Sequence, residues 1–181
     1  MWRNFNGNTI QAGTWNTADV TSSKPGQAVV NVKDLKPGDE DHTASAKVDY
    51  KFTADKNAVD KSFAQVLIKG ITAKDKQNTP IQDVAQSELA KHLHLKFIID
   101  SYPGDPDSVV ENKTLAEWYQ ESKKDNGQVL LLKDGKLSDN PEHRKNNKNA
   151  LVSWWLDKDV EASAQLASIA FDMGAQVDVR P

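Results

Sequence analysis

The chain has 181 residues and a formal net charge of −3, a length that suits one domain with a hydrophobic core. The small net charge gives no basic footprint for nucleic acid, and the absence of cysteine excludes disulfides, cysteine-ligated zinc and thiol catalysis. No apolar run reaches about 18 residues, so no transmembrane helix is predicted. No apolar segment of signal-peptide type opens the chain, but a secreted protein would look the same after its signal had been removed.

The chain opens with a weak strand pattern in the segment NTIQAGTWNT, residues 8–17. This segment has few apolar residues and is interrupted by Gly13, which allows a bulge or a bend before Trp15. No second strand pattern stands beside it as an obvious hairpin partner. We therefore treat residues 1–12 as an N-terminal arm and residues 13–181 as a single domain.

Alternating apolar and polar residues predict that this domain consists mainly of β-strands. Side chains on a strand point to opposite faces in turn, so the alternation marks strands with one buried face. The longest alternations cover residues 44–53, 93–99 and 167–179. Shorter candidate strands cover residues 28–32, 63–71, 128–133 and 151–156.

Two segments between the strands carry helical signals. Thr79 is a candidate N-cap because Pro80 follows it at the first helical position, and apolar residues then recur at helical spacing up to Leu89. A second capping box begins at Thr114, and Gly127 ends the helix that follows. We expect both helices to be short insertions that pack over one end of the β-structure.

Turn residues separate these elements. In the turn at residues 36–39 the proline presets φ, and we expect Gly38 to adopt a positive φ. The pair Asp134-Gly135 predicts a hairpin, and the polar segment 138–148 predicts a mobile surface loop. Seven or eight antiparallel strands with two short helical insertions indicate a mainly β fold, an antiparallel β-sandwich of jelly-roll type.

Few residues suggest a catalytic or metal site. His92 and His94 are two positions apart on one predicted strand, so both face the same side and can bind a metal. No third ligand is signalled, and Lys96 shares their face. The sequence has no H-E-x-x-H motif, no G-x-S-x-G motif and no glycine-rich phosphate loop. We therefore predict no catalytic residues, no metal site and no cofactor, and expect that the protein is not an enzyme.

Two further features suggest a binding module. The acidic segments 39–41 and 105–107 offer the oxygen ligands that Ca²⁺ prefers, without the spacing of an EF-hand. Trp154 and Trp155 are adjacent on a predicted strand, so one faces the core. The other is a candidate platform for a sugar ring or an interface anchor, and a position under an inserted helix is an equal alternative. These features support an alternative, a monomeric cell-surface jelly-roll module that binds a glycan or a cation.

Several motifs, taken in their order along the chain, resemble one known family. The segment NTIQAGT, residues 8–14, precedes a strand pattern, and LKPGD, residues 35–39, then leads into a long alternating strand. The segment LASIAFDMGAQ, residues 166–176, is similar to the closing strand of the same family. Over roughly the first third and the last tenth, the chain resembles TasA/camelysin-type biofilm matrix fibre proteins, which are related to archaeal bundling pilins.

The resemblance implies a secreted structural subunit of extracellular biofilm-matrix fibres or pili, in the matrix or at the cell surface. Subunits of that family join head-to-tail by donor-strand complementation, in which the N-terminal segment of one subunit fills a groove in the next. The implied partners are further copies of the chain and an anchoring or minor fibre protein, with no nucleic acid and no membrane after signal removal. Some members carry a metallopeptidase label, which we do not carry over because this sequence has no recognisable zinc motif.

The physical chemistry of sheet edges is consistent with such an assembly. An open edge is a template for strand addition, and a head-to-tail contact that does not close generates a filament. Two alternatives stay open, since the arm can instead pair within its own chain or fray. Gly13 is a candidate hinge between the arm and the rest of the subunit. The candidate donor-strand and interface residues are Trp2, Phe5, Ile10, Ala12 and Gly13.

Overall fold

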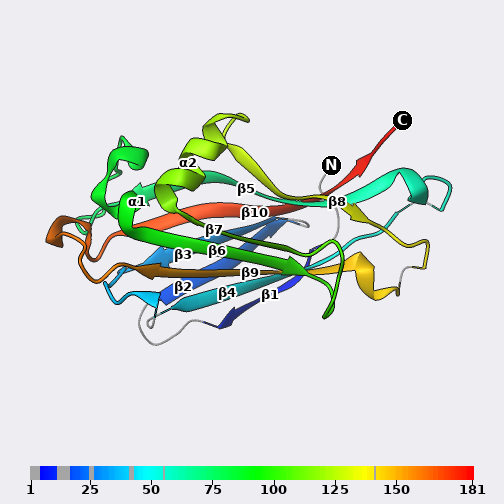
Figure 1. Ribbon diagram of the computed structural model, residues 1–181, viewed down its shortest axis with the longest axis horizontal. Coiled ribbons are helices and arrows are strands. Elements are labelled where there is room, and N and C mark those ends of the chain that lie inside the picture. Colours follow the sequence, from blue (N-terminus) through cyan, green and yellow to red (C-terminus); the bar gives the residue numbers. More distant parts are fainter. Residues whose placement is uncertain (1–4, 12–16, 25–26, 41–42, 55, 141) are drawn as a thin grey trace.

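The chain forms a sandwich of two five-stranded antiparallel sheets, with two short helices toward one end of its long axis (Figure 1). The prediction of a mainly β sandwich is confirmed. No helix in the described part of the chain is long and apolar enough to cross a membrane. Side chains are described from Gln27 onward, and the computed structural model describes the backbone of residues 5–11, 17–24, 27–40, 43–54, 56–140 and 142–181.

The two sheets are named here after their central strands. The β9 sheet has the order β1-β4-β9-β6-β7, and the β10 sheet has the order β2-β3-β10-β5-β8. The strands of the β9 sheet are β1 (Phe5–Gln11), β4 (Ala44–Lys51), β9 (Asn147–Leu156), β6 (Leu93–Asp100) and β7 (Val109–Thr114). Those of the β10 sheet are β2 (Thr17–Lys24), β3 (Gln27–Lys33), β10 (Ser168–Val179), β5 (Ser62–Lys74) and β8 (Gln128–Lys136).

Eight of the ten described strands, β3 to β10, follow β1 and β2 in the chain. They form two blocks of four strands, in the orders β3-β10-β5-β8 and β4-β9-β6-β7. The chain crosses between the two blocks at most of its connections, an arrangement that is compatible with a jelly roll. β1 and β2 extend these blocks by one strand each, next to β4 and β3 respectively. They are therefore additional edge strands.

The alternation in the sequence defines the core. In β4 and β6 every second side chain is buried, because one face of each strand meets the opposite sheet. Phe97 of β6 lies 5.9 Å from Phe171 of β10 between ring centroids, so the two sheets meet through aromatic rings. Trp118 packs edge-on against Phe97 and donates a 3.0 Å hydrogen bond from Nε1 to the carbonyl oxygen of Leu95.

The helix α2 (Leu115–Lys123) begins as predicted. The hydroxyl of Thr114 accepts a hydrogen bond from the N–H of Glu117, and the Glu117 carboxylate accepts one from the N–H of Thr114. This capping box satisfies backbone donors that the first turn leaves free. Beyond the helix, Gly127 adopts a positive φ of 86°, which glycine tolerates at a helix C-terminus.

The helix predicted from Thr79 is wrong in position. The carboxylate of Asp75 accepts a 2.9 Å hydrogen bond from the N–H of Thr79, so this segment forms a turn after β5. Pro80 then lies in an isolated β-bridge with the end of β5. The helix α1 (Glu88–His92) begins later, where the side chain of Ser87 accepts a hydrogen bond from the backbone and acts as the N-cap.

Two turn predictions are also wrong. Asp134 and Gly135 lie within β8, where Gly135 pairs with Ala64 of β5, so they do not form a hairpin turn. In the turn at residues 36–39 the positive φ of 53° belongs to Asp39 and not to Gly38. Aspartate tolerates this region better than most residues, which is why the turn does not need its glycine there.

Segment 138–148 was predicted to be a mobile loop, and its second half is anchored instead. Asn146 is fully buried, and its side-chain amide donates to the carbonyl oxygens of Ser138 and Asn140 while accepting from the N–H of Ser138. Lys148, already in β9, is fully buried as well. The polar composition of this segment therefore serves internal hydrogen bonds as well as solvent.

Candidate functional site

The N-terminal edge of the β9 sheet is the candidate assembly site. β1 pairs antiparallel with β4 of its own chain, from Phe5 opposite Tyr50 to Gln11 opposite Ser45. The register shifts between Phe5 and Gly7, as it does at a β-bulge. Pairing within the chain is one of the alternatives that the sequence left open, and exchange of β1 between copies stays a prediction.

The five candidate interface residues are placed only in part. Phe5 and Ile10 belong to β1, and Ile10 lies opposite Ala46 of β4. Trp2, Ala12 and Gly13 lie outside the described residues, and so does the predicted boundary between arm and domain. Of the five candidate residues, the register therefore gives only Phe5 and Ile10 a partner on β4.

β4 offers a regular edge to β1. Its core-facing residues Ala46, Val48 and Tyr50 are at most 1% exposed. On its other side β4 pairs with β9 along its whole length, from Ala44 opposite Trp154 onward. The pairing with β9 therefore holds β4 in the sheet independently of its pairing with β1.

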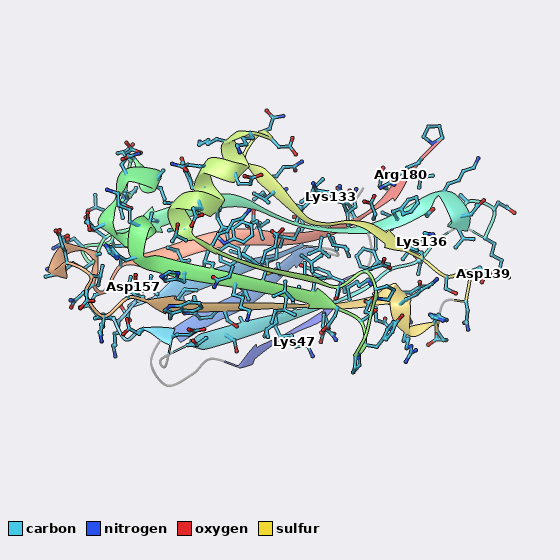
Figure 2. All side chains as sticks on the ribbon, viewed as in Figure 1. Lys47, Lys133, Lys136, Asp139, Asp157 and Arg180 are labelled. Carbon is cyan, nitrogen blue, oxygen red and sulfur yellow. The ribbon has the colours of Figure 1, made fainter. Side chains whose placement is uncertain are left out.

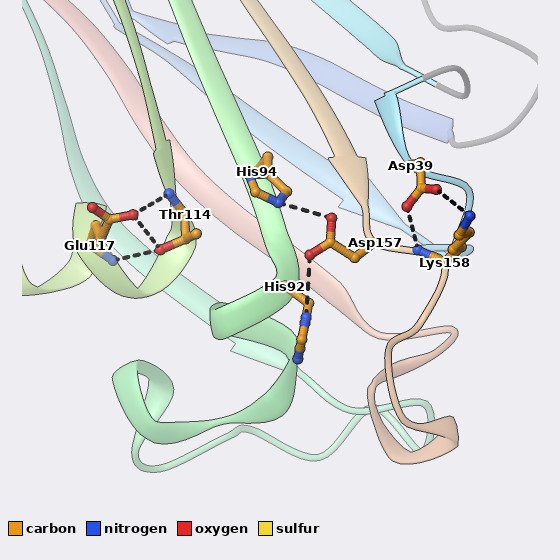
Figure 3. Close-up of polar contacts among 7 residues, drawn as sticks. All are labelled: Asp39, His92, His94, Thr114, Glu117, Asp157 and Lys158. Atoms are coloured by element: carbon orange, nitrogen blue, oxygen red, sulfur yellow. Dashed lines mark hydrogen bonds and ion pairs between the residues drawn. The ribbon is translucent and has the colours of Figure 1, made fainter.

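The two histidines singled out in the sequence lie close together, although not on one strand. His92 is the last residue of α1 and His94 lies on β6. Both rings contact Asp157, which follows β9 (Figure 3). His92 Nδ1 is 3.3 Å from Oδ2 of Asp157, and His94 Nε2 is 3.0 Å from Oδ1. Glu88 places Oε2 3.4 Å from the other ring nitrogen of His92.

This cluster joins three elements and does not form a cage for one ion. Asp157 lies between the two rings and contacts each with a different oxygen, so the three side chains do not converge on a common point. The described residues contain no group of three or more His, Cys, Asp or Glu side chains that can hold a metal ion. The contacts link α1, β6 and the end of β9. No sequence pattern signals Asp157, because it lies more than sixty residues beyond both histidines.

The adjacent tryptophans face opposite sides, as expected. Trp154 is fully buried in the core, whereas Trp155 lies outside the core cluster and is 8% exposed. The ring of His94 stacks on Trp155, with centroids 4.8 Å apart and planes 8° from parallel. Neither indole therefore presents an open face to a sugar ring.

In the acidic loop at residues 105–107, the carboxylate of Asp105 is already bound by donors from the protein. Asp105 accepts hydrogen bonds from the N–H groups of Ser101 and Asp107 and from the buried ammonium of Lys148. Burial alone would raise the pKa of the Asp105 carboxyl, but these hydrogen bonds outweigh it and lower the pKa to about 2. The carboxylate is therefore ionised, and the Lys148 ammonium balances its charge. This pairing disfavours the binding of a further cation.

The other acidic segment is also engaged. Oδ1 of Asp39 accepts a 2.8 Å hydrogen bond from the backbone N–H of Lys158, and Oδ2 lies 3.5 Å from the ammonium of the same lysine (Figure 3). The contact joins the turn at residues 36–39 to the segment after β9. Asp41 lies outside the described residues.

No family model matches the chain, and no curated protein does either. Among solved structures, one titled "Structural analysis of an exo-beta-agarase" is similar with a TM-score of 0.34 and 7% sequence identity. The similarity covers 98% of this chain and 23% of the agarase chain. A similarity of this extent identifies neither a family nor an activity.

Proposed function

We propose that this protein is a secreted structural subunit of an extracellular fibre or pilus of the biofilm-matrix type. Each copy joins the next head-to-tail by donating β1 to β4 of its neighbour. The observation that carries this proposal is the position of β1, which is an edge strand and pairs with only one strand of its sheet, β4. The resemblance of the sequence to TasA/camelysin-type fibre proteins supports the same function independently.

β1 is well placed to be exchanged. Within its sheet it pairs with one strand, β4, and the chain then passes through residues 12–16 to β2 in the other sheet. The pairing with β4 can be made by β1 of a second copy in the same register. Exchange therefore keeps the same strand pairing and costs mainly the entropy of association.

Such an exchange forms a chain of subunits because donor and acceptor are different surfaces. One copy uses its own β1 to donate and the edge of its β4 to accept. A contact between two unlike surfaces is heterologous, and it continues into a filament unless the rotation between subunits closes a ring. Tryptophan and phenylalanine in the arm, at positions 2 and 5, add apolar side chains that strand addition at the neighbour's edge would bury.

A disulfide that locks β1 onto its own β4 tests this proposal. Thr9 lies opposite Lys47, which sits on β4 (Figure 2), and directly opposed residues are close enough to form a disulfide. The wild-type chain has no cysteine, so Thr9→Cys with Lys47→Cys creates a single pair. The oxidised double variant should remain monomeric in electron microscopy and size-exclusion chromatography, and reduction should restore filaments.

A matched lock on the other side of β4 provides the control. Lys47 also lies opposite Leu151 of β9. The variant Lys47→Cys with Leu151→Cys therefore links β4 to β9, two strands that stay paired when β1 is exchanged. This variant should assemble normally when oxidised. Filaments formed by monomers whose Thr9–Lys47 disulfide had closed within one chain before assembly would contradict the proposal, and so would a closed dimer as the end point of wild-type assembly.

Deletion of residues 1–12 is a second test. The truncated chain should fold, because β1 is an edge strand and the two blocks of four strands from β3 to β10 do not include it. It should form no filaments, and a synthetic peptide of residues 1–12 should bind to it. If the folded, truncated chain still gives normal filaments, the arm is not the donor.

A further inference from the structure

Two cavities lie on the outer face of the β10 sheet, over its central strand, and are together called the trough here. Ser168 and Ala170 of β10 lie on this face, since their neighbours Ile169 and Phe171 point into the core. Their small side chains form the floor of a cavity of about 300 Å³. The walls come from the flanking strands and include Lys33 and Asn31 of β3 and Lys74 and Thr72 of β5.

Strand register explains the shape of this cavity. Ala170 lies opposite Asn31 on one side and opposite Thr72 on the other, and Ser168 lies opposite Lys74. In each of these rows across the sheet, the small side chain on β10 is therefore flanked by longer side chains on the neighbouring strands. Neighbouring strands are about 4.8 Å apart, so the backbones of Lys33 on β3 and Lys74 on β5 lie roughly 10 Å from each other across the trough.

A second cavity follows on the same face of β10. It has a volume of about 260 Å³ and includes Asp172, which lies two residues beyond Ala170, together with Tyr119 and Asn126 from α2 and the turn after it. A bulge in β5 at Gly70, whose φ is +65°, shapes its other side. A strand rises about 3.3 Å per residue, so Ser168 and Asp172 lie roughly 13 Å apart along β10.

The charges of the two cavities favour an anionic ligand. Among the residues whose side chains the structure describes, five lysines and three aspartates line them, a surplus of two positive charges in a chain whose net charge is −3. One of the aspartates, Asp75, uses a carboxylate oxygen to accept the N–H groups of Gln77 and Thr79 within its own turn. The five lysines are Lys33, Lys69, Lys74, Lys76 and Lys123.

The neutral and acidic groups indicate that the ligand also carries hydroxyl groups. Asp172 is partly buried, and this burial raises the pKa of its carboxyl while nearby Lys69 opposes the rise. A carboxylate within the trough repels a dense polyanion such as nucleic acid, but it accepts hydrogen bonds from hydroxyl groups. Thr72, Ser168 and Asn126 add further hydroxyl and amide partners.

We propose that the trough over β10 binds a linear acidic polysaccharide. Its carboxylate groups pair with the lysines of the walls, and its sugar hydroxyl groups form hydrogen bonds with the polar side chains of the two cavities. This surface is on the β10 sheet and involves neither β1 nor β4, so the proposal stands whether or not the protein polymerises.

Calorimetric titration of the full chain with polygalacturonate tests the proposal, with neutral dextran and duplex DNA as comparison polymers. The variant Lys33→Glu/Lys74→Glu reverses one charge on each wall and should lower the affinity for polygalacturonate at least about tenfold. Ala170→Leu fills the floor without changing charge and should lower it similarly. Lys96→Glu, on the outer face of the β9 sheet, is the matched control and should change it less than about twofold.

Circular dichroism and thermal unfolding establish that each variant is folded. Saturable binding of polygalacturonate, lost in both trough variants and kept in Lys96→Glu, is the expected result. Absence of binding overturns the proposal. Equal binding of dextran or DNA overturns it as well, and so does an equal loss in Lys96→Glu or undiminished binding by folded Ala170→Leu.

Discussion

The ammonium nitrogen of Lys148 lies 2.8 Å from Oδ2 of Asp105, and both side chains are almost completely buried. The hydroxyl of Ser101 joins the pair, since it donates to Asp105 at 2.6 Å and lies 3.3 Å from the Lys148 nitrogen. Lys148 belongs to β9 and lies opposite Tyr50 of β4, whereas Asp105 lies in the loop between β6 and β7. The ion pair therefore fastens this loop to the β9 sheet.

Breaking this pair on one side should destabilise the fold strongly. Lys148→Met leaves the Asp105 carboxylate buried without its cation, and we expect a loss of about 3–5 kcal/mol in the free energy of unfolding. The double variant Lys148→Met/Asp105→Leu removes both charges and should lose much less. Urea unfolding of the three proteins checks this, and equal losses in the single and double variants would show that the charge is not the cause.

The same pair should contribute to stability in a defined pH range. The folded pKa of Asp105, about 2, lies below the ordinary value of an aspartate, so its contribution is complete above about pH 5 and is progressively lost as the pH falls toward 2. We expect the difference in unfolding free energy between wild type and Asp105→Asn to shrink by about 2 kcal/mol between pH 6 and pH 2. An unchanged difference across this range would contradict the assigned pKa.

The capping box of α2 gives a smaller, local prediction. Thr114→Ala removes the hydroxyl that accepts from the N–H of Glu117 and should cost about 0.5–2 kcal/mol of stability. Thr114→Ser keeps a hydroxyl at the same position and should cost clearly less. Thermal unfolding of both variants measures the difference, and equal melting temperatures would mean that the cap does not stabilise the helix.

Much of the fold could be predicted because its signals are local. The alternation around Val48 and Phe97 shows in the sequence as well as in the structure, where every second side chain is buried. Thr114 and Glu117 identify a helix start by their spacing alone. Thr79 and Pro80 carry a similar signal, but the N–H of Thr79 donates to the carboxylate of Asp75, and the segment forms a turn in place of a helix.

What the sequence does not predict depends on contacts between distant residues. β7 was not predicted, since Val109–Thr114 alternates only weakly and gains its place by pairing with β6. Lys148 and Asp105 stand 43 residues apart, and His94 and Asp157 stand 63 apart, so neither pair has a local signature. The trough over Ser168 and Ala170 arises from the register of three strands, which alternation alone does not fix.

The most direct test of strand donation mixes two chains that each carry one cysteine, Thr9→Cys in one and Lys47→Cys in the other. Under assembly conditions strand donation should give a disulfide between the two different chains, visible on a non-reducing gel, because Thr9 of a donor would then lie opposite Lys47 of its acceptor, as it lies opposite Lys47 within one chain. A mixture of Thr9→Cys with Leu151→Cys should give no such product, since Leu151 lies one strand further from β1. Filaments that form without any cross-link between the Thr9→Cys and Lys47→Cys chains would contradict the donation of β1 to β4 of a neighbour.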